Sequence, residues 1–163
     1  MTTDKGNTKL TPQSLEEIKA VMDKNLGTIL ETLKSITDDE LNFQIDPSKR
    51  TIGEIVSHVL STTRIFFLGK VFGVFFKKTI KQALTHPVDA SDFHWQPTTA
   101  KKRKPKSFKR QELIYKVENR RPKIMKRYHA ADKVTDLLHY ETWHVSCHTR
   151  QIQTIVQALK SEQ

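Results

Sequence analysis

Apolar residues recur every three or four positions along four stretches of this chain, and this period constrains the fold more than any other feature. Such spacing places the apolar side chains on one face of an α-helix, which other helices must then cover. Only 5 Gly and 6 Pro occur among the 163 residues, and a chain of this length can bury a core without disulfides or a structural metal. The sequence therefore predicts a single all-α domain spanning residues 1–163, with residues 1–10 flexible.

The first helix has clear start signals. Thr11-Pro12 fits an N-cap followed by a first helical position, and Ser14 with Glu17 fits a capping box slightly later. An apolar stripe then continues to Ile36. We expect a polar connection over residues 37–48 to end this helix.

The second helix opens at another capping box, Thr51-Ile-Gly-Glu54. Its apolar run continues through residues 67–76, after a break that we expect near Gly69 or Gly73. From residue 85 to 107 the helical pattern stops, because three X-Pro pairs interrupt it and basic residues fill the remainder. This interval predicts a long crossover loop between the second and third helices.

The last two helices are expected at residues 108–129 and 132–160. Ser107 is the predicted N-cap of the third, and Pro122 inside it predicts a kink or an interruption. The fourth is the best defined, with an apolar seam that runs from Leu137 to Leu159. The chain is thus predicted to form a four-helix bundle.

Polar groups lie in the middle of the fourth helix's apolar face. With Leu137 at zero on a helical wheel, His144 falls near 340°, His148 near 20° and Glu141 near 40°. Burying such groups without partners costs on the order of a few kcal/mol. Histidines at i and i+4 place both rings on one side of a helix, which suits capture of a metal ion. Core or surface histidines are the alternative reading of this pair.

Two further polar residues bear on this seam. His58 lies on the flank of the second helix's stripe, where a histidine by itself would be a boundary residue. A metal site inside a bundle needs a ligand from another helix, and His58 could supply it. Glu141 fits a partner of the ligands or a general base. The alternative for it is a salt bridge, or contact with solvent, at the end of the bundle.

Two segments resemble motifs of the DinB/YfiT-like superfamily. Thr51-Ile-Gly-Glu-Ile-Val-Ser-His58-Val-Leu resembles the opening of that family's second helix, and His144-Val-Ser-Cys-His148-Thr-Arg-Gln-Ile152 resembles its H-x-x-x-H-x-x-Q-I motif on the fourth. The resemblance covers nearly the whole chain. It implies a four-helix bundle of up-down-down-up topology, with a long connection between helices two and three. It also implies one metal ion held by His58, His144 and His148, with water completing the shell.

Three histidines with an open position are typical of catalytic metal sites. Nickel, zinc, manganese and iron all accept such ligands, and the ion could acidify water or a thiol to give a nucleophile. Because the family includes thiol-dependent transferases and isomerases, the resemblance implies a metal-dependent hydrolase or thiol transferase. It would act on a small molecule, with a low-molecular-weight thiol as a further cofactor.

Other residues near the motif are expected to have structural roles. Cys147 points about 100° away from its neighbour His148, so we expect a packed, inert thiol. Trp143 fits helix packing. Arg150 and Gln151 are expected to cover the surface or contact a neighbouring helix. The remaining histidines are expected at the surface: His86, His94, His129 and His139.

The formal net charge of +10 is concentrated in one region. Residues 101–133 carry 14 basic and 3 acidic side chains, whereas residues 1–50 carry 7 and 9. Lys101–Lys106 also distinguishes the chain from many DinB-like relatives. A solvated basic face is one reading. The alternative function is a nucleic-acid or anionic-partner binding module using residues 101–127.

The apolar residues and the single cysteine bear on where the protein is located and how it assembles. No stretch resembles a signal peptide or approaches the ~20 apolar residues of a membrane span. The single cysteine fits a reducing compartment, so we expect a cytoplasmic protein. Phe72, Phe75 and Phe76 predict apolar surface that would suit a homodimer.

Overall fold

A computed structural model of the chain describes residues 13–67, 77–94 and 104–161. Within these ranges the backbone forms six helices and no strand, which confirms the all-α class. No helix there combines the length and apolar character needed to span a bilayer. The helices are α1 (Leu15–Ser35), α2 (Asp38–Asn42), α3 (Ile52–Phe67), α4 (Lys77–Ala83), α5 (Arg110–His129) and α6 (Asp136–Ser161).

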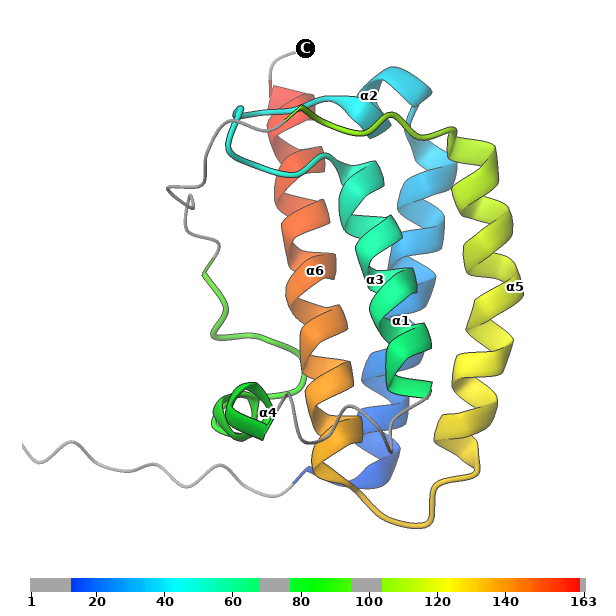
Figure 1. The fold of residues 1–163 in the computed structure, drawn as a ribbon, viewed down its shortest axis with the longest axis vertical. Helices are drawn as coiled ribbons and strands as arrows, with labels where there is room; N and C mark the ends of the chain where they lie inside the picture. Colours follow the sequence, from blue (N-terminus) through cyan, green and yellow to red (C-terminus); the bar gives the residue numbers. More distant parts are fainter. Residues whose placement is uncertain (1–12, 68–76, 95–103, 162–163) are drawn as a thin grey trace, which may run out of the picture.

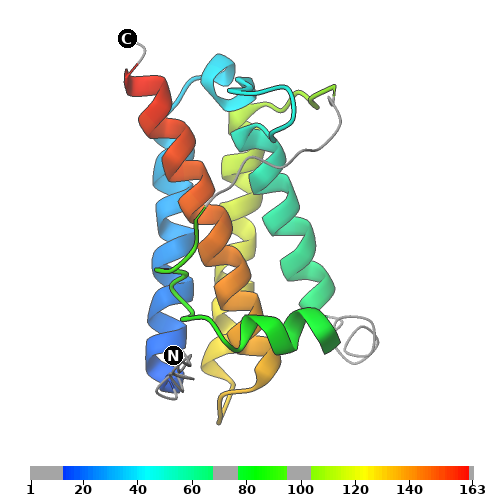
Figure 2. The ribbon, with the colours of Figure 1, turned by 90° about the vertical axis from the view of Figure 1, so that its left-hand side faces the viewer.

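The four long helices lie side by side (Figure 1). Helices α1 and α6 run in one direction along the molecule, and α3 and α5 run in the other. Helix α1 packs against α5 and α6, and α3 packs against the same two helices. The short α4 runs crosswise to them and packs on α6 (Figure 2). Helices α3 and α6 are therefore neighbours, although many residues separate them in the chain.

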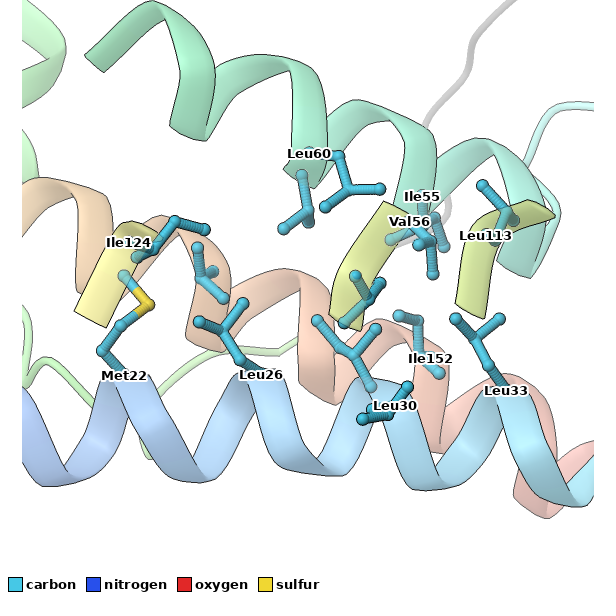
Figure 3. Close-up of a cluster of buried hydrophobic side chains, with 14 of the residues drawn as sticks. Met22, Leu26, Leu30, Leu33, Ile55, Val56, Leu60, Leu113, Ile124 and Ile152 are labelled. Carbon is cyan, nitrogen blue, oxygen red and sulfur yellow. The ribbon is translucent and has the colours of Figure 1, made fainter. Parts of the chain in front are cut away.

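The core lies between the four long helices (Figure 3). Each large aliphatic side chain buried there contributes roughly 1.5–3 kcal/mol. The predicted stripe of α1 is buried along its length, and α3, α5 and α6 each add residues from their apolar faces. Side chains of this cluster include Met22, Leu26, Leu30, Leu33, Ile55, Val56, Leu60, Leu113, Ile124 and Ile152.

Both capping boxes predicted within the described residues are confirmed. The Ser14 hydroxyl accepts from the Glu17 amide at 3.2 Å, and the Glu17 carboxylate accepts from the Ser14 amide at 2.7 Å. Thr51 and Glu54 exchange the same two bonds, each at 3.2 Å, and so fix the start of α3. The expected N-cap at residue 11 lies outside the described residues.

The start of α5 differs from its prediction, because Ser107 is not the N-cap. Lys109 occupies that position without a side-chain cap. The missing acceptors come from α2, a short helix within the connection that we expected only to be polar. Asp38 accepts from the Arg110 amide at 2.8 Å, and Asn42 accepts from the Phe108 amide at 2.8 Å. A partner 66 or more residues away thus satisfies the amides at this helix end.

Three further features of the helices differ from what the sequence predicts. Of the kink or interruption expected at Pro122, the interruption is absent, because helix α5 passes through this residue as one element. Helix α6 begins at Asp136, several residues later than predicted. Helix α4 was not predicted at all. Its apolar content is too small to show a periodic stripe, and Ala83 is its single buried side chain.

The crossover is anchored more firmly than a loop prediction implies. Residues 84–94 contain no helix or strand, as expected, yet Val88 and Ala90 are buried. The Ser146 hydroxyl donates to the Val88 carbonyl at 2.5 Å, and the Arg150 Nε donates to the Asp89 carbonyl at 3.1 Å. The expectations for residues 1–10, for the continuation of the second helix and for its three phenylalanines lie outside the described residues.

Candidate metal centre

The fold brings His58, His144 and His148 together. His58 comes from α3, and the other two lie one turn apart on the neighbouring α6. One ring nitrogen of each lies within 4.8 Å of the others, and His144 Nε2 and His148 Nε2 are 3.1 Å apart. These are the three residues that the sequence motifs singled out as candidate metal ligands.

The three rings meet edge to face. Their centroids are 5.3 Å apart for His58 and His144, 4.9 Å for His58 and His148, and 4.5 Å for His144 and His148. The interplanar angles lie between 64° and 86°. Rings so inclined do not stack, so their nitrogen edges can approach one another.

The environment keeps these histidines neutral. Burial and the neighbouring histidines lower the pKa of His144 to about 3. Burial also lowers the pKa of His148 to about 4, although Gln151 opposes that shift. The pKa of His58 is lowered as well, by burial and by the charge of Arg50. Neutral imidazole is the form that binds a metal, so little proton competition is expected near pH 7.

Gln151 orients one of the rings, a role that the sequence analysis missed. Its side-chain Oε1 lies 2.7 Å from His148 Nδ1. An amide oxygen can only accept, so Nδ1 carries the proton and Nε2 presents its lone pair to the other histidines. Metal-binding histidines are commonly held this way. The i, i+3 spacing of His148 and Gln151 was the available signal.

Glu141 belongs to a different cluster, although it shares the seam with the histidines. Its carboxylate pairs with Arg127 of α5 and accepts from the Tyr128 hydroxyl at 3.2 Å. Tyr128 also lies 2.9 Å from the Thr142 hydroxyl. Burial raises the pKa of Glu141, and Arg127 opposes the rise. Of the expected roles, the salt bridge is the one observed.

Two residues in or beside the motif segment have the structural roles predicted for them. Cys147 is buried, and burial raises the pKa of its thiol to about 12, which fits the packed, inert role. Trp143 packs on the α4 segment and stacks on His86 at 5.5 Å, as expected for a packing residue.

The other four histidines do not all lie at the surface. His94 and His129 are exposed, as expected. His86 is half-buried and lies 2.6 Å from Asp92, while His139 Nε2 lies 3.0 Å from the His86 carbonyl. The first contact lies within the crossover, and the second joins the crossover to α6; neither was visible in the sequence.

The donor set fits one transition-metal ion. Two nitrogen ligands, each about 2.1 Å from an ion and about 90–110° apart, would lie roughly 3.0–3.4 Å from one another. The 3.1 Å separation of His144 Nε2 and His148 Nε2 falls in that interval. Imidazole suits zinc, copper, iron and nickel, so the donors alone do not select the metal.

The family model of the DinB superfamily matches residues 22–152 of this chain. The matched segment contains all three histidines and parts of all four long helices. Comparisons with curated proteins and with solved structures gave no match. Since the family model covers most of the sequence, this chain belongs to the DinB superfamily.

Proposed function

We propose that this DinB-superfamily protein binds one divalent transition-metal ion through His58, His144 and His148. The observation that carries the proposal is the convergence of three imidazoles from α3 and α6 within 4.8 Å. We further propose that residues 1–163 are one domain, with the up-down-down-up bundle topology of the family. That topology is supported by the shared direction of α1 and α6, the opposite direction of α3 and α5, and the mutual packing of the four long helices.

We infer that the centre is catalytic, in a metal-dependent hydrolase or thiol-dependent transferase acting on a small molecule. Three histidine ligands leave coordination positions open, and a divalent ion there supplies Lewis acidity that activates water or a thiol. The chain's own residues set up the site. Gln151 fixes the His148 ring, and partial burial of the three histidines limits access of water.

Metal analysis of the purified protein tests the binding proposal. We expect close to one ion per chain, and His148→Ala should lose most of it. His144→Ala and His58→Ala should behave alike. Glu141→Gln is the matched control, because Glu141 lies on the same helix but pairs with Arg127. Equal metal content in the wild type and His148→Ala would contradict the assignment.

A separate assay tests catalysis. The metal-loaded and metal-free proteins would be screened with thiols, electrophiles and hydrolysable esters. We expect turnover only in the loaded form. Absence of metal-dependent turnover would leave a binding role for the same three histidines.

A second candidate function is binding of nucleic acid or another anionic partner through the basic segment 101–127. Six described lysines favour it, because they are exposed and form no ion pair within the described residues: Lys104, Lys106, Lys109, Lys116, Lys123 and Lys126. The arginines of α5 count against it.

Each of these arginines donates a hydrogen bond to an oxygen of another helix or of the residue at its end: Arg110, Arg120, Arg121 and Arg127. The number of cations available to phosphates is therefore smaller than the sequence suggests. Binding of duplex DNA or RNA at low salt, with a steep loss as salt rises, would favour this function. No binding at low salt would remove it.

A further inference from the structure

The crossover, residues 84–94, follows α4 and lies against α6 (Figure 2). His86 near its start is held through its ring and through its backbone. Because a carboxylate only accepts, His86 Nδ1 donates to Asp92, at 2.6 Å. The His86 carbonyl accepts from His139 Nε2 of α6 at 3.0 Å, and the His86 amide donates to the Ala83 carbonyl of α4 at 3.0 Å. The place of the His86 ring is therefore fixed by contacts with the crossover, with α4 and with α6.

The His86 ring stacks on Trp143 of α6. The two ring centroids are 5.5 Å apart, and the planes are inclined by 16°. Trp143 also packs against the small apolar cluster that contains Ala83 and Tyr140. Its buried Nε1 has no hydrogen-bond partner among the residues that the structure describes. Stacking and apolar packing therefore hold the Trp143 ring in place.

Tyr140 connects Trp143 to the metal centre. It precedes Trp143 by three residues and His144 by four, so both are its neighbours on the surface of the helix. Its ring centroid lies 6.2 Å from that of Trp143 and 5.9 Å from that of His144. Both distances fall within the range of about 4.5–7 Å in which aromatic rings attract each other. Because Tyr140 is only 5% exposed, its ring has little room to turn away from His144.

These contacts bear on metal binding through the orientation of the His144 ring. A histidine that can adopt several rotamers must be ordered when it binds an ion, and this ordering reduces the affinity. At His148 the Gln151 side chain fixes the ring by a hydrogen bond. At His144 the Tyr140 ring occupies the space on one side. It thereby restricts His144 to orientations such as the observed one, in which its Nε2 lies 3.1 Å from His148 Nε2.

We propose that the aromatic cluster of Tyr140, Trp143 and His86, with Asp92 holding His86, positions the His144 ring for metal binding. These are positioning residues, which act on the ion through His144 and the packed rings between them. The crossover supplies His86 and Asp92, and so regulates the metal affinity although its described residues contribute no candidate ligand. The inference deepens the proposed function and depends on it.

Titration of the metal-free protein with cobalt(II) tests this role, because the visible absorption of cobalt reports both its affinity and the geometry of its ligands without requiring activity. Tyr140→Leu removes the ring beside His144. It should weaken cobalt binding by about 3- to 10-fold, the factor that one aromatic pair is worth, and should change the absorption of the bound ion. Tyr140→Phe keeps the ring and should match the wild type in both measurements. An equal loss in Tyr140→Phe would overturn the role of the ring.

Variants at His86 test the part of the crossover. His86→Ala removes the ring stacked on Trp143 and should weaken cobalt binding by about 2- to 5-fold, the lower part of the same range, because it acts through two further rings. The losses in the double variant Tyr140→Leu/His86→Ala should be less than additive, since His86 acts through Tyr140. His129→Ala is the matched control, because this histidine is exposed on α5, and it should leave cobalt binding unchanged.

The outcomes separate this inference from the proposal beneath it. No cobalt uptake by the unmodified protein would overturn both. Cobalt uptake with equal affinities in the wild type and His86→Ala would overturn the inference and leave the metal centre standing. Fully additive losses in the double variant would also overturn it, because His86 would then act independently of Tyr140. If Tyr140→Leu unfolds, His86→Ala still gives the comparison, since that side chain is 35% exposed.

Discussion

Helix α6 carries two buried polar clusters about one turn apart, and they differ in how their polar atoms are satisfied. Glu141 is fully buried. Its carboxylate forms an ion pair with Arg127 of α5 and accepts a hydrogen bond from the Tyr128 hydroxyl. His144 and His148 aim their Nε2 atoms at one another, 3.1 Å apart. In the first cluster the ion pair neutralises the buried carboxylate. In the second cluster the imidazole nitrogens bring together lone pairs that suit a cation.

The difference lies in the helix that faces each cluster. Glu141, His144 and His148 share one seam of α6, so position along that helix does not distinguish them. Helix α5 supplies a cation opposite Glu141, while α3 supplies a further imidazole opposite the histidine pair. The carboxylate cluster should therefore contribute to stability, and the histidine cluster to binding.

The largest expected effect is on stability at Glu141. Glu141→Ala leaves Arg127 without its buried partner and should lower the free energy of unfolding by about 3–5 kcal/mol. Urea unfolding of the metal-free protein measures the loss. His148→Ala should cost much less in the same experiment. A larger loss for His148→Ala than for Glu141→Ala would reverse the comparison.

The two clusters should also respond to pH in opposite directions. His144 and His148 have folded-state pKa values of about 3 and 4, below the ordinary 6.5. The unfolded chain therefore binds more protons, and stability should fall by on the order of a few kcal/mol as the pH drops from 6.5 toward 4. The folded-state pKa of Glu141 is raised above 4.5. The stabilisation linked to this raised pKa is thus fully present below pH 4.5 and is lost as the pH rises through the folded value. The ionised carboxylate keeps its pairing with Arg127, which opposes the rise of the pKa.

Unfolding of the metal-free protein, followed from pH 4 to 8, separates these two responses. The double variant His144→Ala/His148→Ala should flatten the loss on the acid side, and Glu141→Gln should change the profile above pH 4.5. An acid-side loss that survives in the double variant would show that other groups cause it.

Gln151→Ala should affect binding and leave stability nearly unchanged. Without the Oε1 acceptor, the His148 ring loses the contact that fixes its proton on Nδ1, and metal affinity should fall by about 10- to 100-fold. Competition with a chromophoric chelator measures the affinity. Gln153→Ala is the control, since this residue is exposed on the same helix. Equal affinities for the two variants would deny Gln151 its orienting role.

The smallest effect is expected at Cys147, which adjoins His148 in sequence but is packed in the interior. Cys147→Ala should leave metal content unchanged and cost no more than about 1 kcal/mol. Because burial raises the thiol pKa to about 12, a disulfide reagent should label the folded protein far more slowly than the unfolded one. Rapid labelling of the folded chain would place this thiol in the accessible part of the site.

Local patterns predicted most of the helices but not all of their ends. The capping boxes at Ser14 and Thr51 depend on side chains three residues apart, so the sequence was sufficient there. The start of α5 depends on Asp38, far away in the chain, and no local pattern could show it. Helix α4 was not predicted because it packs on α6 through few apolar side chains, too few to form a periodic stripe in the sequence.

For the site, the sequence determined which residues could take part, and the tertiary structure decided which of them meet. The i, i+4 spacing fixes His144 and His148 on one face of a helix, because helical phase is local. His58 joins them only because α3 packs on α6. Glu141 shares the phase of the pair, but Arg127 of α5 faces it and takes its charge. The local sequence determines which face of its helix each residue occupies. The packing of the helices determines which residue of another helix it contacts, because such contacts join residues far apart in the chain.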